Sequence, residues 1–140
     1  MQTNASSAAS CYLDTSALVK LIVEEAESPA LLDYLRNYPS LISSAITRVE
    51  LIRAARTRGV VNVDRAREIL DDLRLLSPSD SLLNLAASLD PPSLRSLDAI
   101  HVASALTVRE EIEAVVTYDT RMIVAALEVG LPVQSPGKNA

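Results

Sequence analysis

Short apolar runs alternate with segments of helical periodicity along almost the whole chain. Each run has the length and the aliphatic or β-branched composition of a buried strand. The runs lie at 11–13, 41–42, 75–76 and 114–117, and a final one begins at Val133. The helices expected between them cover 17–22, 29–37, 47–58, 63–73, 81–89, 97–111 and 120–129. Strands that alternate with amphipathic helices predict a single α/β domain, in which helices cover both faces of a parallel sheet.

Composition limits the ways in which this domain can meet a partner. The chain has 140 residues, of which 49% are hydrophobic, so one compact aliphatic core is expected. A formal net charge of −5 argues against nucleic-acid binding through a broad basic surface. The absence of Phe and Trp argues against an aromatic platform for single-stranded bases. Neither feature excludes an enzyme that holds phosphates through bound cations and a few local arginines.

The single cysteine and the first residues restrict the compartment. Cys11 has no partner for an internal disulfide and cannot form a thiolate cluster, so we expect it to be a buried strand residue. The first ten residues are small and polar, which predicts a flexible tail and not a signal peptide. No segment approaches the roughly 18 apolar residues of a membrane span, and a cytoplasmic protein without membrane contact is expected.

Four acidic residues stand where a parallel sheet places its functional sites. Asp14 ends the first strand, and Asp119 follows the strand at 114–117 after a single intervening residue. Glu50 and Asp98 lie in the first turns of their helices. In open sheets of this kind, ligands bind outside the carboxyl ends of the strands. We therefore expect the four carboxylates to gather at one edge of the sheet.

Each acid also has a purely structural explanation. Asp14 or Asp119 could cap the helix that follows it, and Asp98 could interact with its helix dipole. Thr47 and Glu50 match a capping box, in which the glutamate bonds back to the amide of the threonine. As a group, however, crowded carboxylates repel by roughly 4 kcal/mol per pair at 4 Å and an effective dielectric near 20. Such a cluster needs protons or cations, and hard oxygen ligands favour Mg²⁺ or Mn²⁺, which points to phosphodiester chemistry.

The segments around these acids resemble the PIN-domain nucleases, and within them the VapC-type toxins of type II toxin–antitoxin systems. The matching segments are LDTSAL at 13–18, TRVEL at 47–51, LDAIHVASA at 97–105 and VTYD at 116–119. Each motif alone is weakly specific, but four in this order in a short chain are specific. The resemblance extends over 11–136, which makes 1–10 and 137–140 the expected tails.

The resemblance implies a fold, a cofactor and partners. The expected fold is a five-stranded parallel sheet in the order 3-2-1-4-5. The expected activity is an endoribonuclease that cuts single-stranded or loop RNA by means of a water activated by Mg²⁺ or Mn²⁺, leaving a 5′ phosphate. The expected assembly is a homodimer inhibited by a VapB-type antitoxin.

The resemblance also implies roles for particular residues. The core acids that bind metal correspond to Asp14, Glu50 and Asp98, and the more variable fourth acid corresponds to Asp119. Hydroxyls that orient carboxylates or waters correspond to Thr15, Ser16 and Thr117. Some relatives have a further acid shortly after the fourth, where this chain has Thr120 and Arg121, so the number of metals stays open.

Four other polar residues have a structural explanation as well as a functional one. His101 shares a helix face with Asp98 and is expected to be a hydrogen-bonded structural residue. Arg48, Arg53 and Arg121 are candidates for RNA or antitoxin contact, although a solvated surface is the default for the arginines of the 47–58 helix.

Other functions are compatible with parts of the pattern. A phospho-accepting receiver domain has similar topology, but it pairs two acids after its first strand, places the acceptor Asp after the third, and has a Lys after the fifth. A haloacid-dehalogenase-like phosphatase needs a second acid two positions after the first, where this chain has Ser16. A catalytically silent PIN-like binding module remains the main alternative.

Overall fold

The computed structural model describes residues 10–138 and consists of five strands and seven helices in that range. The strands are β1 (Ser10–Leu13), β2 (Ser40–Ser44), β3 (Arg74–Leu76), β4 (Ile112–Val116) and β5 (Val133–Gln134). The helices are α1 (Thr15–Ile22), α2 (Ser28–Leu35), α3 (Thr47–Arg56), α4 (Val60–Asp72), α5 (Asp80–Ala87), α6 (Ser96–Thr107) and α7 (Thr120–Glu128). The expected tails at 1–10 and 137–140 lie outside the described residues, apart from Ser10, Gly137 and Lys138.

The strands form one parallel sheet in the order β3-β2-β1-β4-β5, which confirms the predicted topology. From β1 the chain builds outward through β2 to β3, and it then returns to place β4 on the other side of β1. The strand order therefore reverses between β1 and β4. Parallel strands that diverge at such a point leave a crevice at their carboxyl ends, where ligands bind.

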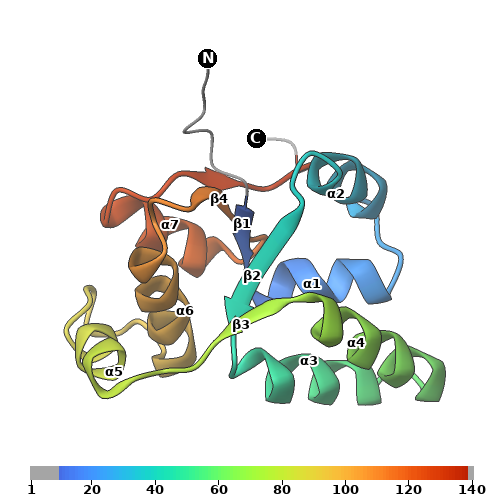
Figure 1. Cartoon of the computed structure of the whole chain (residues 1–140), viewed down its shortest axis with the longest axis horizontal. Helices are drawn as coiled ribbons and strands as arrows, with labels where there is room; N and C mark the ends of the chain where they lie inside the picture. Colours follow the sequence, from blue (N-terminus) through green and yellow to red (C-terminus); the bar gives the residue numbers. More distant parts are fainter. Residues whose placement is uncertain (1–9, 139–140) are drawn as a thin grey trace.

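Helices cover the two faces of the sheet as two separate groups. In Figure 1, α1 to α4 lie on one side of the strands and α5 to α7 on the other. Alternate residues of β1 point to opposite faces: Leu13 packs with the core of α1 to α4, whereas Tyr12 packs with the core of α6 and α7. In β4, Val116 and Val115 divide in the same way. The central strands are thus apolar on both faces, as expected of a parallel sheet.

The largest differences from the predicted helix boundaries lie at the end of α6 and at the start of α4. The sequence pattern continues the 97–111 helix too far, because α6 ends at Thr107 and the chain needs the following residues to turn and enter β4 at Ile112. Val108 leaves the helix and is buried in the core of α6 and α7, which fixes this turn. The helix that starts at Thr47 ends at Arg56, and Gly59, with a φ of 107°, redirects the chain into α4 three residues earlier than predicted.

Two further sequence expectations concern Cys11 and membrane-spanning segments. Cys11 is fully buried in β1, and burial raises the pKa of its thiol to about 11, so the thiol stays protonated at neutral pH. Within residues 10–138, no helix combines the length and the apolar character needed to cross a membrane.

Candidate active site

Asp14 stands at the junction of β1 and α1, where it links the ends of the two central strands. Its Oδ1 accepts hydrogen bonds from the Ser16 hydroxyl at 2.7 Å and from the Ala17 amide at 3.1 Å, so it caps α1. Its Oδ2 accepts a 2.6 Å bond from the Thr117 hydroxyl, which follows β4. Asp14 is therefore both a helix cap and the anchor of a contact between residues 103 positions apart.

Burial sets the protonation behaviour of Asp14. The residue is only 5% exposed, and this burial raises its pKa from the ordinary aspartate value. The hydroxyl groups of Thr117 and Ser16 act in the opposite direction, because they donate to the ionised form. Because burial outweighs these bonds, the ionised form of Asp14 is unfavourable unless a cation lies beside it.

The Ser16 and Thr117 hydroxyls join the ends of β1 and β4 into one network. Their oxygens lie 3.3 Å apart, and the Tyr118 amide donates to the Ser16 oxygen at 3.0 Å. The Asp119 amide donates to the Thr117 oxygen at 3.1 Å. Ser16 and Thr117, two of the three hydroxyl residues expected near the acids, thus connect Asp14 with Asp119. The connection runs through the backbone that follows β4.

Glu50 enters the same edge from the first turn of α3. Its Oε1 accepts bonds from the Thr15 hydroxyl at 2.7 Å and from Nε2 of His101 at 2.8 Å. Burial alone would raise the pKa of Glu50, but the bonds from His101 and Thr15 outweigh it and lower the pKa. The capping-box explanation for Glu50 is wrong, because the Thr47 hydroxyl bonds to Ser43 instead and no side chain caps α3.

His101 supports Glu50 from α6. The imidazole is 2% exposed, and its Nδ1 lies 2.7 Å from the Tyr12 hydroxyl in the core of the sheet. With the proton on Nε2, the ring donates to Glu50 and accepts from Tyr12, so both ring nitrogens have a partner. The expectation that His101 is a hydrogen-bonded structural residue is met, but its partner is one of the candidate catalytic acids.

Arg95 holds the other two acids together. Its Nε lies 3.1 Å from Oδ2 of Asp98, and its Nη2 lies 3.4 Å from Oδ2 of Asp119. The Arg95 side chain is 59% exposed, whereas the Asp98 side chain is 15% exposed. Asp119 also caps α7, since its Oδ1 accepts a 2.9 Å bond from the Arg121 amide. Sequence analysis missed Arg95, although an arginine three residues before an acid at a helix start is a recognisable ion-pair pattern.

The four acids reach one edge of the sheet without forming a closed cage. Among residues 10–138, no three acid, histidine or cysteine side chains already surround a single point. Mg²⁺ does not require that arrangement, since one or two carboxylates with waters and substrate phosphates complete its shell. Oδ1 of Asp98 and Oε2 of Glu50 accept no hydrogen bond from these described residues, and Asp14 is a buried acid in need of a cation. These carboxylate oxygens are therefore the kind of ligand that a divalent metal such as Mg²⁺ prefers.

The arginines named from the sequence occupy two different surfaces. Arg48 and Arg53 are exposed on α3, and Arg53 borders a shallow depression away from the acid pairs. Arg121 is exposed at the start of α7, directly after Asp119. Of these three, Arg121 lies beside the candidate site, where it lines a hollow together with Arg95.

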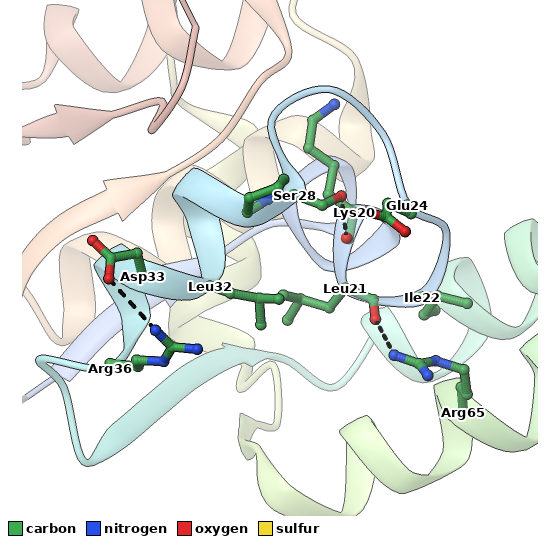
Figure 2. A pocket seen from close by; sticks show the side chains of 10 residues that line it. Lys20, Leu21, Ile22, Glu24, Ser28, Leu32, Asp33, Arg36 and Arg65 are labelled. Atoms are coloured by element: carbon green, nitrogen blue, oxygen red, sulfur yellow. Dashed lines mark hydrogen bonds and ion pairs between the residues drawn. The ribbon is translucent and has the colours of Figure 1, made fainter.

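A separate hollow of about 640 Å³ lies between α1, α2 and α4 (Figure 2). Leu21 and Leu32 point toward each other across it, and Ile22 extends this apolar surface. Charged residues of both signs surround the hollow, among them Arg36, which pairs with Asp33, and Arg65, whose guanidinium donates to the Leu21 carbonyl at 2.9 Å. None of the four acids lines it.

Comparison with known proteins identifies the family. The PIN domain family profile matches residues 11–127. Ribonuclease VapC46 of Mycobacterium tuberculosis (strain ATCC 25618 / H37Rv) is 43% identical over 128 residues, which cover 91% of this chain and 98% of the relative. Ribonuclease VapC47 of Mycobacterium tuberculosis (strain CDC 1551 / Oshkosh) is 40% identical over 131 residues, which cover 90% and 96%.

Solved structures share the fold at lower sequence identity. A toxin–antitoxin complex from Klebsiella pneumoniae matches with a TM-score of 0.69 at 22% identity, over 90% of this chain and 97% of that one. VapC20 of Mycobacterium tuberculosis, described as a sarcin-ricin loop cleaving toxin, matches with a TM-score of 0.69 at 18% identity, over 82% and 94%. The profile, the relatives and the sheet order agree with the resemblance seen in the sequence. The chain therefore belongs to the PIN-domain family, and within it to the VapC type.

Proposed function

We propose that this chain is the toxin of a toxin–antitoxin pair and acts as an Mg²⁺- or Mn²⁺-dependent endoribonuclease on single-stranded or loop RNA. The observation that carries the proposal is the buried carboxylate of Asp14 at the strand switch point, with three further acids around the same edge. Relatives with 40–43% identity bear the name ribonuclease, which supports the reaction class. Family membership excludes the receiver and dehalogenase-like alternatives and leaves the silent binding module as the rival.

The hydrogen bonds of the site suggest a separate role for each residue. Asp14, Glu50, Asp98 and Asp119 would hold the cation, which when bound lowers the pKa of a water for attack on phosphorus and stabilises the leaving oxygen. Thr117 and Ser16 keep Asp14 oriented, and Thr15 keeps Glu50 oriented. His101 holds Glu50 in its ionised form through the bond from Nε2. None of these side chains needs to act as a nucleophile, and the product would carry a 5′ phosphate.

A cleavage assay with amide variants tests this proposal. Asparagine also caps helices well, so Asp14→Asn should fold while losing a charged metal ligand. We expect Asp14→Asn and Asp98→Asn to abolish cleavage of a structured RNA in Mg²⁺ or Mn²⁺, and EDTA to abolish cleavage by the unaltered protein. Asp72→Asn, the same change at an exposed position at the end of α4, is the matched control. Full cleavage by folded Asp14→Asn protein would refute the mechanism, and no cleavage by the unaltered protein would favour the silent module.

We also infer that a VapB-type antitoxin covers the hollow between α1, α2 and α4. Its apolar floor and its charged rim suit an amphipathic peptide segment, and one structural neighbour is a toxin–antitoxin complex. Leu32 is half-exposed there, and Leu83 has similar exposure on α5, on the other side of the sheet. Leu32→Glu should abolish co-purification with the antitoxin while RNA cleavage persists, and Leu83→Glu should change neither. Equal binding by both variants would place the antitoxin elsewhere.

A homodimer is the assembly that we propose for the chain alone. Exposed aliphatic residues occur on several helices, including Val49 on α3 and Leu97 on α6, and such surface is available for self-association. Light scattering at micromolar concentration should give twice the mass of one chain. A strictly monomeric protein under these conditions would contradict this part of the proposal.

A further inference from the structure

A hollow of about 600 Å³ opens beside the acids, between the loop before α6 and the first half of α7. Pro91, Leu94, Val124 and Ala125 form an apolar surface in it. Arg95, which holds Asp98 and Asp119, lines the side that faces the acids. The volume falls within the range of small-molecule sites and would accept one nucleotide.

Two arginines and no acidic residue line this hollow. Arg121 is exposed, and its guanidinium forms no ion pair with any residue in 10–138. Arg95 is more than half exposed although it contacts two carboxylates. The hydroxyls of Ser93 and Thr120 add neutral hydrogen-bonding groups to the lining. An anionic ligand with an apolar body is the chemistry that complements this set.

No aromatic residue is available to bind bases near the acids. The chain has four tyrosines and no Phe or Trp. Tyr12 is buried against His101, Tyr34 and Tyr38 pack on each other, and Tyr118 lies under Lys20. Guanidinium planes can stack on unpaired bases where aromatic rings are lacking. The hollow lined by Arg95 and Arg121 combines such planes with aliphatic surface.

We propose that this hollow binds the nucleotide that flanks the cleaved phosphate of single-stranded RNA. Arg121 contacts the phosphate of that nucleotide, and the base lies between the aliphatic surface of Leu94, Val124 and Ala125 and the guanidinium plane of Arg95. Because Thr120 directly follows Asp119, a nucleotide seated here has its next phosphate at the acid edge. This inference rests on the proposed function and specifies how the substrate is held.

A second copy of the chain is the rival occupant, since Val124 and Leu127 are exposed aliphatic residues on the same helix. A two-fold interface places each patch against itself, which would bring Arg121 toward the same arginine of the other copy. A polyanion satisfies the two guanidinium groups better than a copy that carries the same charges. We therefore favour RNA and treat self-association as an outcome of the test.

The test measures RNA binding without turnover. All variants are made in the Asp14→Asn background with Mg²⁺ present, and the probe is a short fluorescein-labelled single-stranded RNA followed by anisotropy. Val124→Glu places a negative charge in the hollow, and Leu127→Glu places the same charge on α7 outside it. Arg121→Ala removes the phosphate contact, and Arg109→Ala is its matched control after the far end of α6.

We expect Val124→Glu and Arg121→Ala each to weaken binding about five- to tenfold, with at most twofold changes for Leu127→Glu and Arg109→Ala. Arg121→Ala should also reduce the slope of log K against log salt by about 0.7, the value for one lost contact to single-stranded nucleic acid. Circular dichroism and light scattering on each variant check the fold and the assembly.

Four results would overturn the proposal. The first is unchanged RNA affinity in folded Val124→Glu and Arg121→Ala, and the second is a loss of RNA affinity in Leu127→Glu as large as that in Val124→Glu. The third is dissociation of a dimer by Val124→Glu without loss of RNA affinity. The fourth is no RNA binding by the Asp14→Asn background protein. Failure of the proposed function appears elsewhere, as an absence of cleavage by the protein with intact Asp14. A protein that binds RNA through this hollow but never cleaves it would be the silent module.

Discussion

Replacement of Arg95 by alanine should make the protein bind Mn²⁺ more tightly. The guanidinium forms ion pairs of 3.1 Å with Asp98 and 3.4 Å with Asp119, and these pairs must be disrupted or shared before a cation can use both carboxylates. Without Arg95, the same acids present one more uncompensated negative charge to an incoming cation. The direction of the effect therefore follows from charge alone.

The size of the effect can be worked out from the exposure of the ion pairs. Partly exposed pairs contribute about 0.2–1 kcal/mol each, so the two together oppose the cation by about 0.5–2 kcal/mol. Since about 1.4 kcal/mol corresponds to a factor of ten, Arg95→Ala should lower the Mn²⁺ dissociation constant by about two- to thirtyfold. The effect should shrink with added salt, because the guanidinium is largely exposed.

Calorimetric titration of Mn²⁺ into metal-free protein measures this directly. Arg109→Ala removes the same charge after the far end of α6 and should leave the dissociation constant within about twofold. The RNA affinity of Arg95→Ala should fall while its Mn²⁺ affinity rises, so one substitution moves the two equilibria in opposite directions. An unchanged or weaker Mn²⁺ affinity would show that Asp98 and Asp119 do not take part in metal binding.

Three further predictions concern the interior of the site. Because the pKa of buried Asp14 is raised above the ordinary aspartate value, the native metal-free protein binds more protons than the unfolded chain, and its melting temperature should fall as the pH rises above the ordinary aspartate range. Asp14→Asn should flatten this slope in a fluorimetric melt, and a slope that survives in the variant would assign it to other groups. The lowered pKa of Glu50 acts only at lower pH, since its stabilising contribution is lost as the pH falls below the ordinary glutamate range. Mn²⁺ at a hundred times its dissociation constant should stabilise the protein by about 2.7 kcal/mol in urea titrations, and Asp98→Asn should remove most of this gain; equal gains in both proteins would contradict a ligand role for Asp98. Tyr12→Phe and His101→Leu should each destabilise by about 1–3 kcal/mol. The double variant should cost at least about 1 kcal/mol less than their sum, because neither member of the Tyr12–His101 pair is left without the other, and strict additivity would mean that the 2.7 Å contact contributes nothing.

The sheet and the edge that carries the acids were predictable because they depend on local patterns. The apolar, β-branched run at 114–117 and the helical spacing after Asp14 are properties of neighbouring residues, and a parallel sheet follows from the order of such segments. The helix that was expected to reach residue 111 shows where local patterns fail. Val108 leaves the helix because it packs in a core that contains Met122 and Leu131, and no short window of sequence contains those partners.

The connections within the site depend on distant contacts and could not be read from the pattern. His101 bonds to Tyr12, which precedes it by 89 residues, and to Glu50, which precedes it by 51. The same limit explains the capping-box error, since Glu50 has tertiary partners that replace the local one. Arg95 is different, because it lies only three residues from Asp98 and that ion pair could have been predicted from the sequence. Only its contact with Asp119 depends on the fold.

The position of β4 in the sheet means that the acid edge is completed late in the synthesis of the chain. β4 lies next to β1, yet the ribosome makes it about 100 residues later. Until it emerges, Asp14 lacks the Thr117 hydroxyl, and Asp119 does not exist. A nascent chain, or one ended by premature termination before β4, therefore has no complete acid edge. The proposed nuclease would therefore lack its full set of acids until β4 and the start of α7 have left the ribosome.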